Sequence, residues 1–181
     1  MSQSGFRLTP YMKPSTDFSL RALYAALDAQ RKARGLSWAQ ATREMHPKLK
    51  RPSTRPLSPS TVMGVRTKAA AEGDGVLAML QWLNRTPESF IPGHKEKMDA
   101  RLPDLPPGKV LRFDTKKIHA ALNARRIERK MTWSQVAKEA GTATSTLTYL
   151  SKGTRVAFPG VMRIFKWLGH PAAHFTRASD F

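Results

Sequence analysis

The 181-residue sequence contains no cysteine. This absence excludes disulfides, thiol catalysis and cysteine-based zinc sites. The sequence also lacks any apolar run approaching the roughly 18 residues that a membrane-spanning helix requires. Residues 1–17 lack the apolar segment of a secretion signal. We therefore expect a cytoplasmic protein without a membrane segment.

Acidic residues are scarce. The chain has 13 Asp and Glu against 31 Lys and Arg, which gives a formal net charge of +18 and a pI near 11.0. Residues 1–95 carry 15 basic and 6 acidic residues, and residues 96–181 carry 16 and 7, so each part is +9. A basic excess spread over the whole chain favours a polyanionic partner, because binding releases counterions.

Groups that support catalysis or metal binding are also few. The five histidines are scattered. His170 and His174 are four residues apart, but Pro171 lies between them and no glutamate accompanies them, which argues against a metalloprotease helix. No glycine-rich phosphate loop follows a predicted strand. We therefore predict that the protein is not an enzyme and holds no metal or cofactor.

The chain contains an internal repeat. Residues 18–45 match residues 113–140 at an offset of 95, with 10 identities in 28 positions, and the offset becomes 85 after residue 56. Each copy carries two tryptophans at equivalent positions, Trp38 with Trp133 and Trp82 with Trp167. Chance similarity between helices would not readily pair tryptophans twice, so we infer a duplication.

The duplication defines the expected domain organisation. Residues 1–17 form an N-terminal arm, residues 18–92 a first domain, residues 93–112 a linker and residues 113–181 a second domain. The change of offset places a basic insertion within the first domain, at residues 46–56. Four prolines and two glycines between residues 91 and 112 predict a linker that forms neither helix nor strand.

Helical periodicity is clearest in the second copy. Asp114 can cap a helix that runs from Thr115 to about Lys130, and Thr132 can cap a short helix that ends at Gly141. A third helix follows from Thr144. No segment shows the strict alternation of a half-buried strand. The predicted fold class is therefore all-α.

Two short helices joined by a tight turn at Gly141 predict a helix-turn-helix. The second of these helices carries small hydroxyl side chains instead of long cations. Such side chains allow a helix to approach base edges closely, and a threonine methyl can contact the methyl of thymine. Long cations belong on neighbouring elements, from which they reach phosphates.

The stretch MTWSQVAKEAGTATSTLTYLSKG, followed by PGVMRIFKWLGHPAAHF, resembles the lambda-repressor/Cro-like helix-turn-helix family, also called the xenobiotic-response-element type. The resemblance covers residues 113–177 and is weaker in the first copy, which lacks the turn glycine. It implies two tandem five-helix bundles, each with its third helix in the major groove, and a role in transcription regulation. Family members usually carry glutamine where this chain has Trp133, so Gln135 is the substitute for that phosphate contact.

These arguments yield two sets of candidate site residues. The predicted base-facing residues are Thr144, Ser145, Thr148 and Tyr149 in the second copy and Ser60, Met63 and Gly64 in the first. The predicted phosphate contacts are Gln135, Thr142, Lys152, Arg155, Arg66 and Lys68, with Lys48, Lys50, Arg51 and Arg55 in the insertion. Thr142 is also the candidate cap of the second recognition helix, because Ala143 occupies the usual position of the capping serine.

The expected function is sequence-specific binding of double-stranded DNA by a bacterial or phage-associated transcription regulator with two non-identical recognition helices. A single chain would then bind an asymmetric site, whereas a palindrome would indicate a homodimer. The alternative is a regulator, similar to an antiactivator or antitoxin, that binds another protein through the same surfaces. Binding of structured RNA is a third hypothesis, which the charge favours but the recognition-helix pattern does not.

Overall fold

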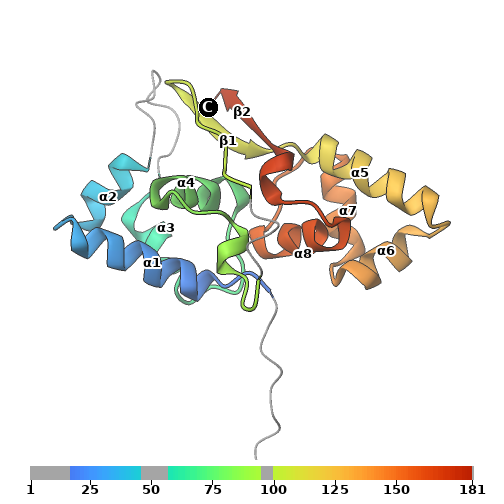
Figure 1. Ribbon diagram of the computed structural model, residues 1–181, viewed down its shortest axis with the longest axis horizontal. Helices are drawn as coiled ribbons and strands as arrows, with labels where there is room; N and C mark the ends of the chain where they lie inside the picture. The colour runs from blue at the N-terminus through green and yellow to red at the C-terminus, as the bar shows by residue number, and fades with distance from the viewer. Residues whose placement is uncertain (1–16, 46–56, 95–99, 181) are drawn as a thin grey trace, which may run out of the picture.

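The computed structural model describes residues 17–45, 57–94 and 100–180 (Figure 1). In the first copy the elements are α1 (Leu20–Ala33), α2 (Trp38–Glu44), α3 (Pro59–Gly64), α4 (Gly73–Leu83) and the 3-10 helix η1 (Glu88–Phe90). In the second copy they are β1 (Lys109–Phe113), α5 (Thr115–Glu128), α6 (Trp133–Ala140), α7 (Thr144–Ser151), α8 (Phe158–Leu168), η3 (Ala172–Phe175) and β2 (Thr176–Asp180). The same helical order therefore occurs in both copies.

Local signals explain where the paired helices begin and end. Helices α2 and α6 both start with a capping box, formed by Ser37 with Gln40 and by Thr132 with Gln135. Each box satisfies backbone N–H groups that the first helical turn leaves without partners. Gly141 ends α6 with φ 65°, a left-handed conformation that glycine adopts without strain. The prediction that Gly141 ends this helix is confirmed.

The prediction of an all-α fold is wrong, because β1 and β2 form a two-stranded antiparallel sheet. Its register pairs Lys109 with Asp180 and Phe113 with Thr176. Leu111 and Phe113 are buried, whereas Val110 and Arg112 are only half-buried. This alternation lies at the end of the segment that the sequence assigned to the linker, next to the prolines. Strand β2 has almost no apolar side chains, so backbone pairing with β1 places it.

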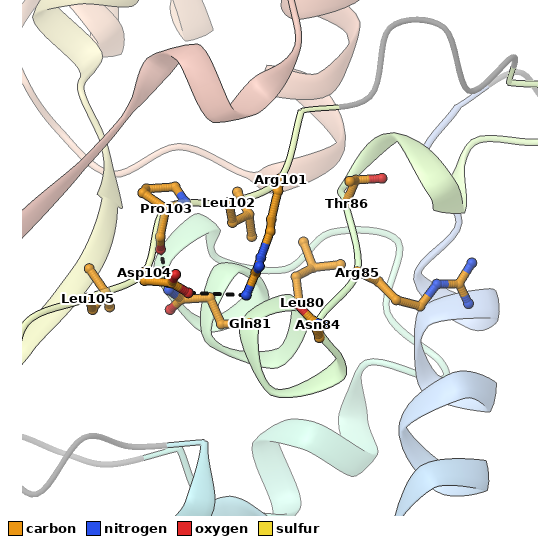
Figure 2. Close-up of a pocket in the computed structure, with 10 residues that line it drawn as sticks. All are labelled: Leu80, Gln81, Asn84, Arg85, Thr86, Arg101, Leu102, Pro103, Asp104 and Leu105. Atoms are coloured by element: carbon orange, nitrogen blue, oxygen red, sulfur yellow. Dashed lines mark hydrogen bonds and ion pairs between the residues drawn. The ribbon is translucent and has the colours of Figure 1, made fainter.

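The remainder of the linker lies against the first copy. The Gln81 side-chain amide donates a hydrogen bond to the Pro103 carbonyl oxygen at 3.2 Å, and Leu102 is 7% exposed. Figure 2 shows Arg101 and Asp104 beside the end of α4, where an ion pair of 3.3 Å joins them. Linker and helix together line an open pocket of about 510 Å³. Residues 101–105 are thus anchored to α4.

The two copies repeat the same cluster of an arginine, a glutamate and a tryptophan. In the first copy Arg34 is 2.6 Å from Glu44, and the Trp82 indole donates to the same carboxylate at 2.9 Å. In the second copy Arg129 is 2.6 Å from Glu139, and Trp167 donates to it at 3.1 Å. Each cluster ties three helices of its copy together. The duplication inferred from sequence is therefore also a duplication of contacts.

Helices α4 and α8 lie in the middle of the molecule, and the helix-turn-helix elements lie toward its two ends (Figure 1). One continuous set of buried side chains contains residues of both copies. Phe158 belongs to this set and is 0% exposed. Its ring centroid is 4.6 Å from that of Phe18 and 5.5 Å from that of Phe113. The division into domains stays a prediction, but the two copies share this core.

None of the helices within residues 17–45, 57–94 and 100–180 is long and apolar enough to cross a membrane.

Candidate nucleic-acid interface

Helix α7 has one buried and one exposed face. Leu147 and Leu150 point into the core, with 3% and 0% of their surface exposed. The side chains on the exposed face are Thr144, Ser145, Thr148 and Tyr149. Tyr149 is 51% exposed. The four residues predicted to face bases therefore form one accessible surface.

The N-terminus of α7 has no side-chain cap. Ala143 occupies the cap position, and no side chain there accepts a backbone hydrogen bond. Thr142 does not replace it as predicted: it is half-buried, and its hydroxyl oxygen lies 3.9 Å from where a Cβ on Gly160 would be. Uncapped N–H groups at a helix N-terminus favour an anion such as phosphate. The local geometry is therefore compatible with a phosphate near this end.

Helix α3 offers a poorer polar surface. It ends at Gly64, so Arg66 and Lys68 lie beyond its last residue. Its cap is Ser58, whose hydroxyl oxygen accepts from the Thr61 backbone N–H at 3.1 Å and lies 2.8 Å from the Ser60 hydroxyl. Met63 is 41% exposed. The predicted base-facing residues of the first copy thus provide a hydroxyl, a thioether and bare backbone.

A cation lies where α7 carries an aromatic ring. Gly64 is equivalent to Tyr149 at the offset of 85. A Cβ on Gly64 would be 3.6 Å from the Lys68 Nζ. Lys68, predicted as a phosphate contact, therefore lies beside Gly64, and the two helices present different chemistry at equivalent places.

The remaining predicted cations lie on the surface around the two helix-turn-helix elements. Lys152 and Arg66 are exposed, and the Arg66 guanidinium lies 5.7 Å from the Tyr24 ring. Arg155 forms an ion pair of 2.7 Å with Glu72. Exposed pairs of this kind contribute little to stability, so Arg155 can exchange the carboxylate for a phosphate.

The start of α6 differs from the arrangement that the family resemblance implies. The Gln135 side-chain oxygen accepts hydrogen bonds from the Thr132 backbone N–H at 2.7 Å and from its hydroxyl at 3.0 Å. Only its amide N–H groups are left to donate to a phosphate. Trp133 stacks on His119 at 5.0 Å, and the Arg126 guanidinium lies 5.0 Å from its ring. Trp133 is therefore a packing residue of its own copy.

One arginine that the sequence did not single out organises the turn. The Arg163 guanidinium of α8 donates to the Gly141 carbonyl oxygen at 2.9 Å and forms an ion pair of 2.9 Å with Asp17. It fixes the helix-turn-helix to α8. Helical spacing could have placed Arg163 at the edge of the apolar face of α8, but it could not have revealed these partners. Lys48, Lys50, Arg51 and Arg55, with the insertion at residues 46–56, lie outside the described residues.

The carboxylates near the recognition surfaces are engaged with cations. The hydrogen bond from Trp82 and the contact with Arg34 lower the pKa of Glu44. Arg129 and then Trp167 lower the pKa of Glu139. Asp74 differs, because burial raises its pKa although Arg112 is nearby. The surface beside α7 is thus not dominated by free negative charge.

The glutamate clusters predict a loss of stability in acid. A carboxyl group whose pKa is lower in the folded state stabilises the fold above its unfolded pKa, which is near 4.5 for glutamate. That contribution is lost as the pH falls through the folded pKa. We expect the Glu44→Gln/Glu139→Gln double variant to lose less unfolding free energy than the wild type between pH 6 and about pH 3. Urea titrations at each pH measure this, with Glu128→Gln as the control; equal losses would contradict the assignment.

Groups of three or more potential metal ligands do not occur within the part of the chain that the structure describes. The rings of His170 and His174 are 6.0 Å apart, and no third ligand of this kind joins them there.

Comparisons of the chain with protein-family models, with curated proteins and with solved structures found no match. The functional argument therefore depends on the residues and their geometry.

Proposed function

We propose that the chain is a transcription regulator that binds double-stranded DNA in a sequence-specific manner and acts in the cytoplasm, at the nucleoid of a bacterium or on a phage or mobile element. The observation that carries this proposal is α7, an exposed helix with hydroxyl side chains on one face and Leu147 and Leu150 buried behind it. A helix of this kind fits the major groove, where base edges present a distinctive pattern of donors and acceptors.

The chemistry of α7 suggests how it would read bases. The Ser145 and Thr144 hydroxyls can donate or accept a hydrogen bond, which allows either kind of base edge. The Thr148 hydroxyl donates to the Thr144 carbonyl at 3.3 Å, a long bond that can exchange for one to a base. Tyr149 adds an aromatic face that can contact a thymine methyl group. Helix α3 would supply a second, less polar reader.

A second candidate is a regulator that binds another protein through the same surfaces. The observation that favours it is that each recognition helix exposes one large apolar side chain, Met63 at 41% and Tyr149 at 51%, which a partner protein could cover. Trp82 and Trp167 do not favour it, since each is half-buried and donates to a glutamate of its own copy. The net charge of +18 makes DNA the better-supported partner.

Selection of bound fragments from random duplex DNA tests the proposal. We expect the selected fragments to share a sequence, and Ser145→Glu to weaken binding to it at least about 100-fold, because a carboxylate on α7 repels phosphates and most base acceptors. Fluorescence anisotropy at fixed salt measures the affinities. Ala124→Glu, an equal charge change at an exposed position of α5, is the matched control and should weaken binding only a few-fold.

Two outcomes would contradict the proposal. One is binding with equal affinity to selected and scrambled duplexes. The other is preferential binding of an A-form RNA duplex of the same sequence, which would favour the RNA hypothesis instead.

A further inference from the structure

The two copies meet at a short antiparallel bridge between the segments that precede α4 and α8. Glu72 pairs with Ala157 in this bridge. The Gly73 backbone N–H donates to the Val156 carbonyl at 3.2 Å, and the Phe158 N–H donates to the Ala71 carbonyl at 2.8 Å.

The bridge is reciprocal with respect to the repeat. At the offset of 85, Ala71 is equivalent to Val156, Glu72 to Ala157 and Gly73 to Phe158. If the two copies are exchanged, the Gly73–Val156 hydrogen bond therefore takes the place of the Phe158–Ala71 hydrogen bond. The pair formed by Glu72 and Ala157 then takes its own place. Contacts of this type define a local two-fold axis, as they do in the isologous interface of a symmetric dimer.

Aromatic side chains cross the junction in the same reciprocal way. Phe18 of the first copy contacts Phe158, with ring centroids 4.6 Å apart. Its equivalent, Phe113, lies over Gly73, where an added Cβ would be 3.0 Å from the ring. Gly73 is the equivalent of Phe158 at the offset of 85, so glycine makes room for one ring of an otherwise symmetric pair.

Ion pairs cross the junction beside these rings. Asp17, which precedes Phe18, lies 2.9 Å from Arg163 of α8. Arg112, which precedes Phe113, lies 3.5 Å from Asp74 of α4. Glu88 of η1 also accepts a buried hydrogen bond of 2.7 Å from the Ala172 N–H of η3. The junction thus combines backbone, aromatic and charged contacts, and the backbone and aromatic contacts join equivalent positions of the two copies.

The arrangement of the helices follows the same axis. A half-turn of Figure 1 in its own plane brings α1 near the place of α5, α2 near that of α6 and α4 near that of α8. Because this half-turn is a rotation about the line of sight, it leaves the distance of each helix from the viewer unchanged. Helices α3 and α7 therefore lie on the same face of the molecule, one on each side of the axis.

We infer that one chain is the counterpart of a two-fold dimer, and that a single molecule occupies a complete DNA site with two unlike half-sites at a fixed spacing. This inference rests on the proposed function. In two-fold dimers of helix-turn-helix proteins the recognition helices enter major grooves about 34 Å apart, one helical turn. In this chain the junction between the two copies takes the place of the dimer interface, so a second chain is not required.

The two half-sites differ because the two helices differ. At equivalent positions α3 presents Met63 and Gly64, with Lys68 beside the glycine, and α7 presents Thr148 and Tyr149. Of the predicted base-facing residues, only Ser60 and Ser145 are identical in the two helices. A lysine ammonium suits guanine acceptors, whereas threonine and tyrosine suit thymine-containing steps. The DNA site is then asymmetric because the two recognition helices of the chain differ, and not because a palindromic site is imperfect.

A cross-link tests whether the junction stays closed on DNA. Glu72 and Ala157 form a non-hydrogen-bonded antiparallel pair, in which side chains are close. Because the chain has no cysteine of its own, the Glu72→Cys/Ala157→Cys variant can form a single defined disulfide. We expect the oxidised variant to be a cross-linked monomer that binds the selected site within about threefold of its reduced form. A loss of binding on oxidation that reduction restores would overturn the inference.

Stoichiometry and footprints test the rest of it. Titration at concentrations well above the Kd should saturate at one chain per site. Ser60→Glu should remove hydroxyl-radical protection from one half of the site, and Ser145→Glu from the other half. Insertion of about 5 base pairs between the halves should weaken binding at least about 100-fold, because half a helical turn moves one half-site to the opposite side of the duplex.

The possible results separate this inference from the proposed function. Two chains on a palindrome, with each variant affecting both halves alike, would overturn the inference alone. Full affinity after the insertion would do the same. The absence of sequence-specific duplex binding would overturn the proposed function and this inference together.

Discussion

Replacement of Phe158 by alanine should destabilise the protein by about 3–5 kcal/mol, the range for loss of a buried phenylalanine. Phe158 is 0% exposed, and its ring contacts Phe18 of one copy and Phe113 of the other. The deletion leaves a cavity between the copies, so we expect both to lose stability together. A chain of two independent domains would lose stability in only one.

Tryptophan fluorescence during urea unfolding can separate the two copies. Trp133→Phe/Trp167→Phe leaves Trp38 and Trp82 as reporters of the first copy, and Trp38→Phe/Trp82→Phe leaves those of the second. In both tryptophan double variants, the added Phe158→Ala substitution should lower the urea concentration at the midpoint of unfolding. Tyr149→Ala, an equally drastic change at a 51% exposed site, is the control and should change stability by less than about 0.5 kcal/mol. An unchanged midpoint for the first-copy reporters would contradict a shared core.

DNA affinity should fall steeply with salt. Eight Lys or Arg side chains are predicted to contact phosphates: Lys152, Arg155, Arg66, Lys68, Lys48, Lys50, Arg51 and Arg55. At about 0.9 per contact the slope of log K against log salt is about −7, so affinity should fall by about 10⁴ between 50 and 200 mM salt. Anisotropy titrations over this range measure the slope.

Single substitutions measure how much each side chain contributes to the slope of log K against log salt. Lys152→Gln should make it shallower by about 1, because one counterion fewer is released. Lys109→Gln is the matched control: Lys109 forms an ion pair of 2.6 Å with Asp180 at the two-stranded sheet, away from both recognition helices, so the slope should not change. Equal effects of the two substitutions would show that the charge acts diffusely and would contradict the assigned contacts.

Much of the helical structure could be predicted from the sequence. Caps and stops gave α6 its bounds, because Thr132 and Gly141 act locally and need no tertiary partner. The end of α3 was less predictable: no glycine in a left-handed conformation terminates it, and the chain after Gly64 turns on weaker signals. The sheet was missed because β2 carries few apolar side chains, and its pairing with β1 depends on residues far apart in the sequence.

The exposed face of α7 could also be anticipated, since buried leucines at positions 147 and 150 leave its other residues outside. The junction between the copies could not. A repeat with a proline-rich connection is equally consistent with two independent domains. No local sequence pattern shows that Gly73 makes room for Phe113. The partners of Arg163 were hidden for the same reason, because one of them, Asp17, lies next to the first copy and far from Arg163 in the sequence.

The connection of both copies through one polypeptide has a consequence for regulation. A repressor assembled from separate subunits must first associate, so its occupancy of an operator depends on the square of subunit concentration when subunits are dilute. A single chain that carries both recognition helices has no such step, so its occupancy of the operator rises hyperbolically with its concentration. Such a regulator would respond in proportion to its own abundance, without the threshold that subunit assembly imposes.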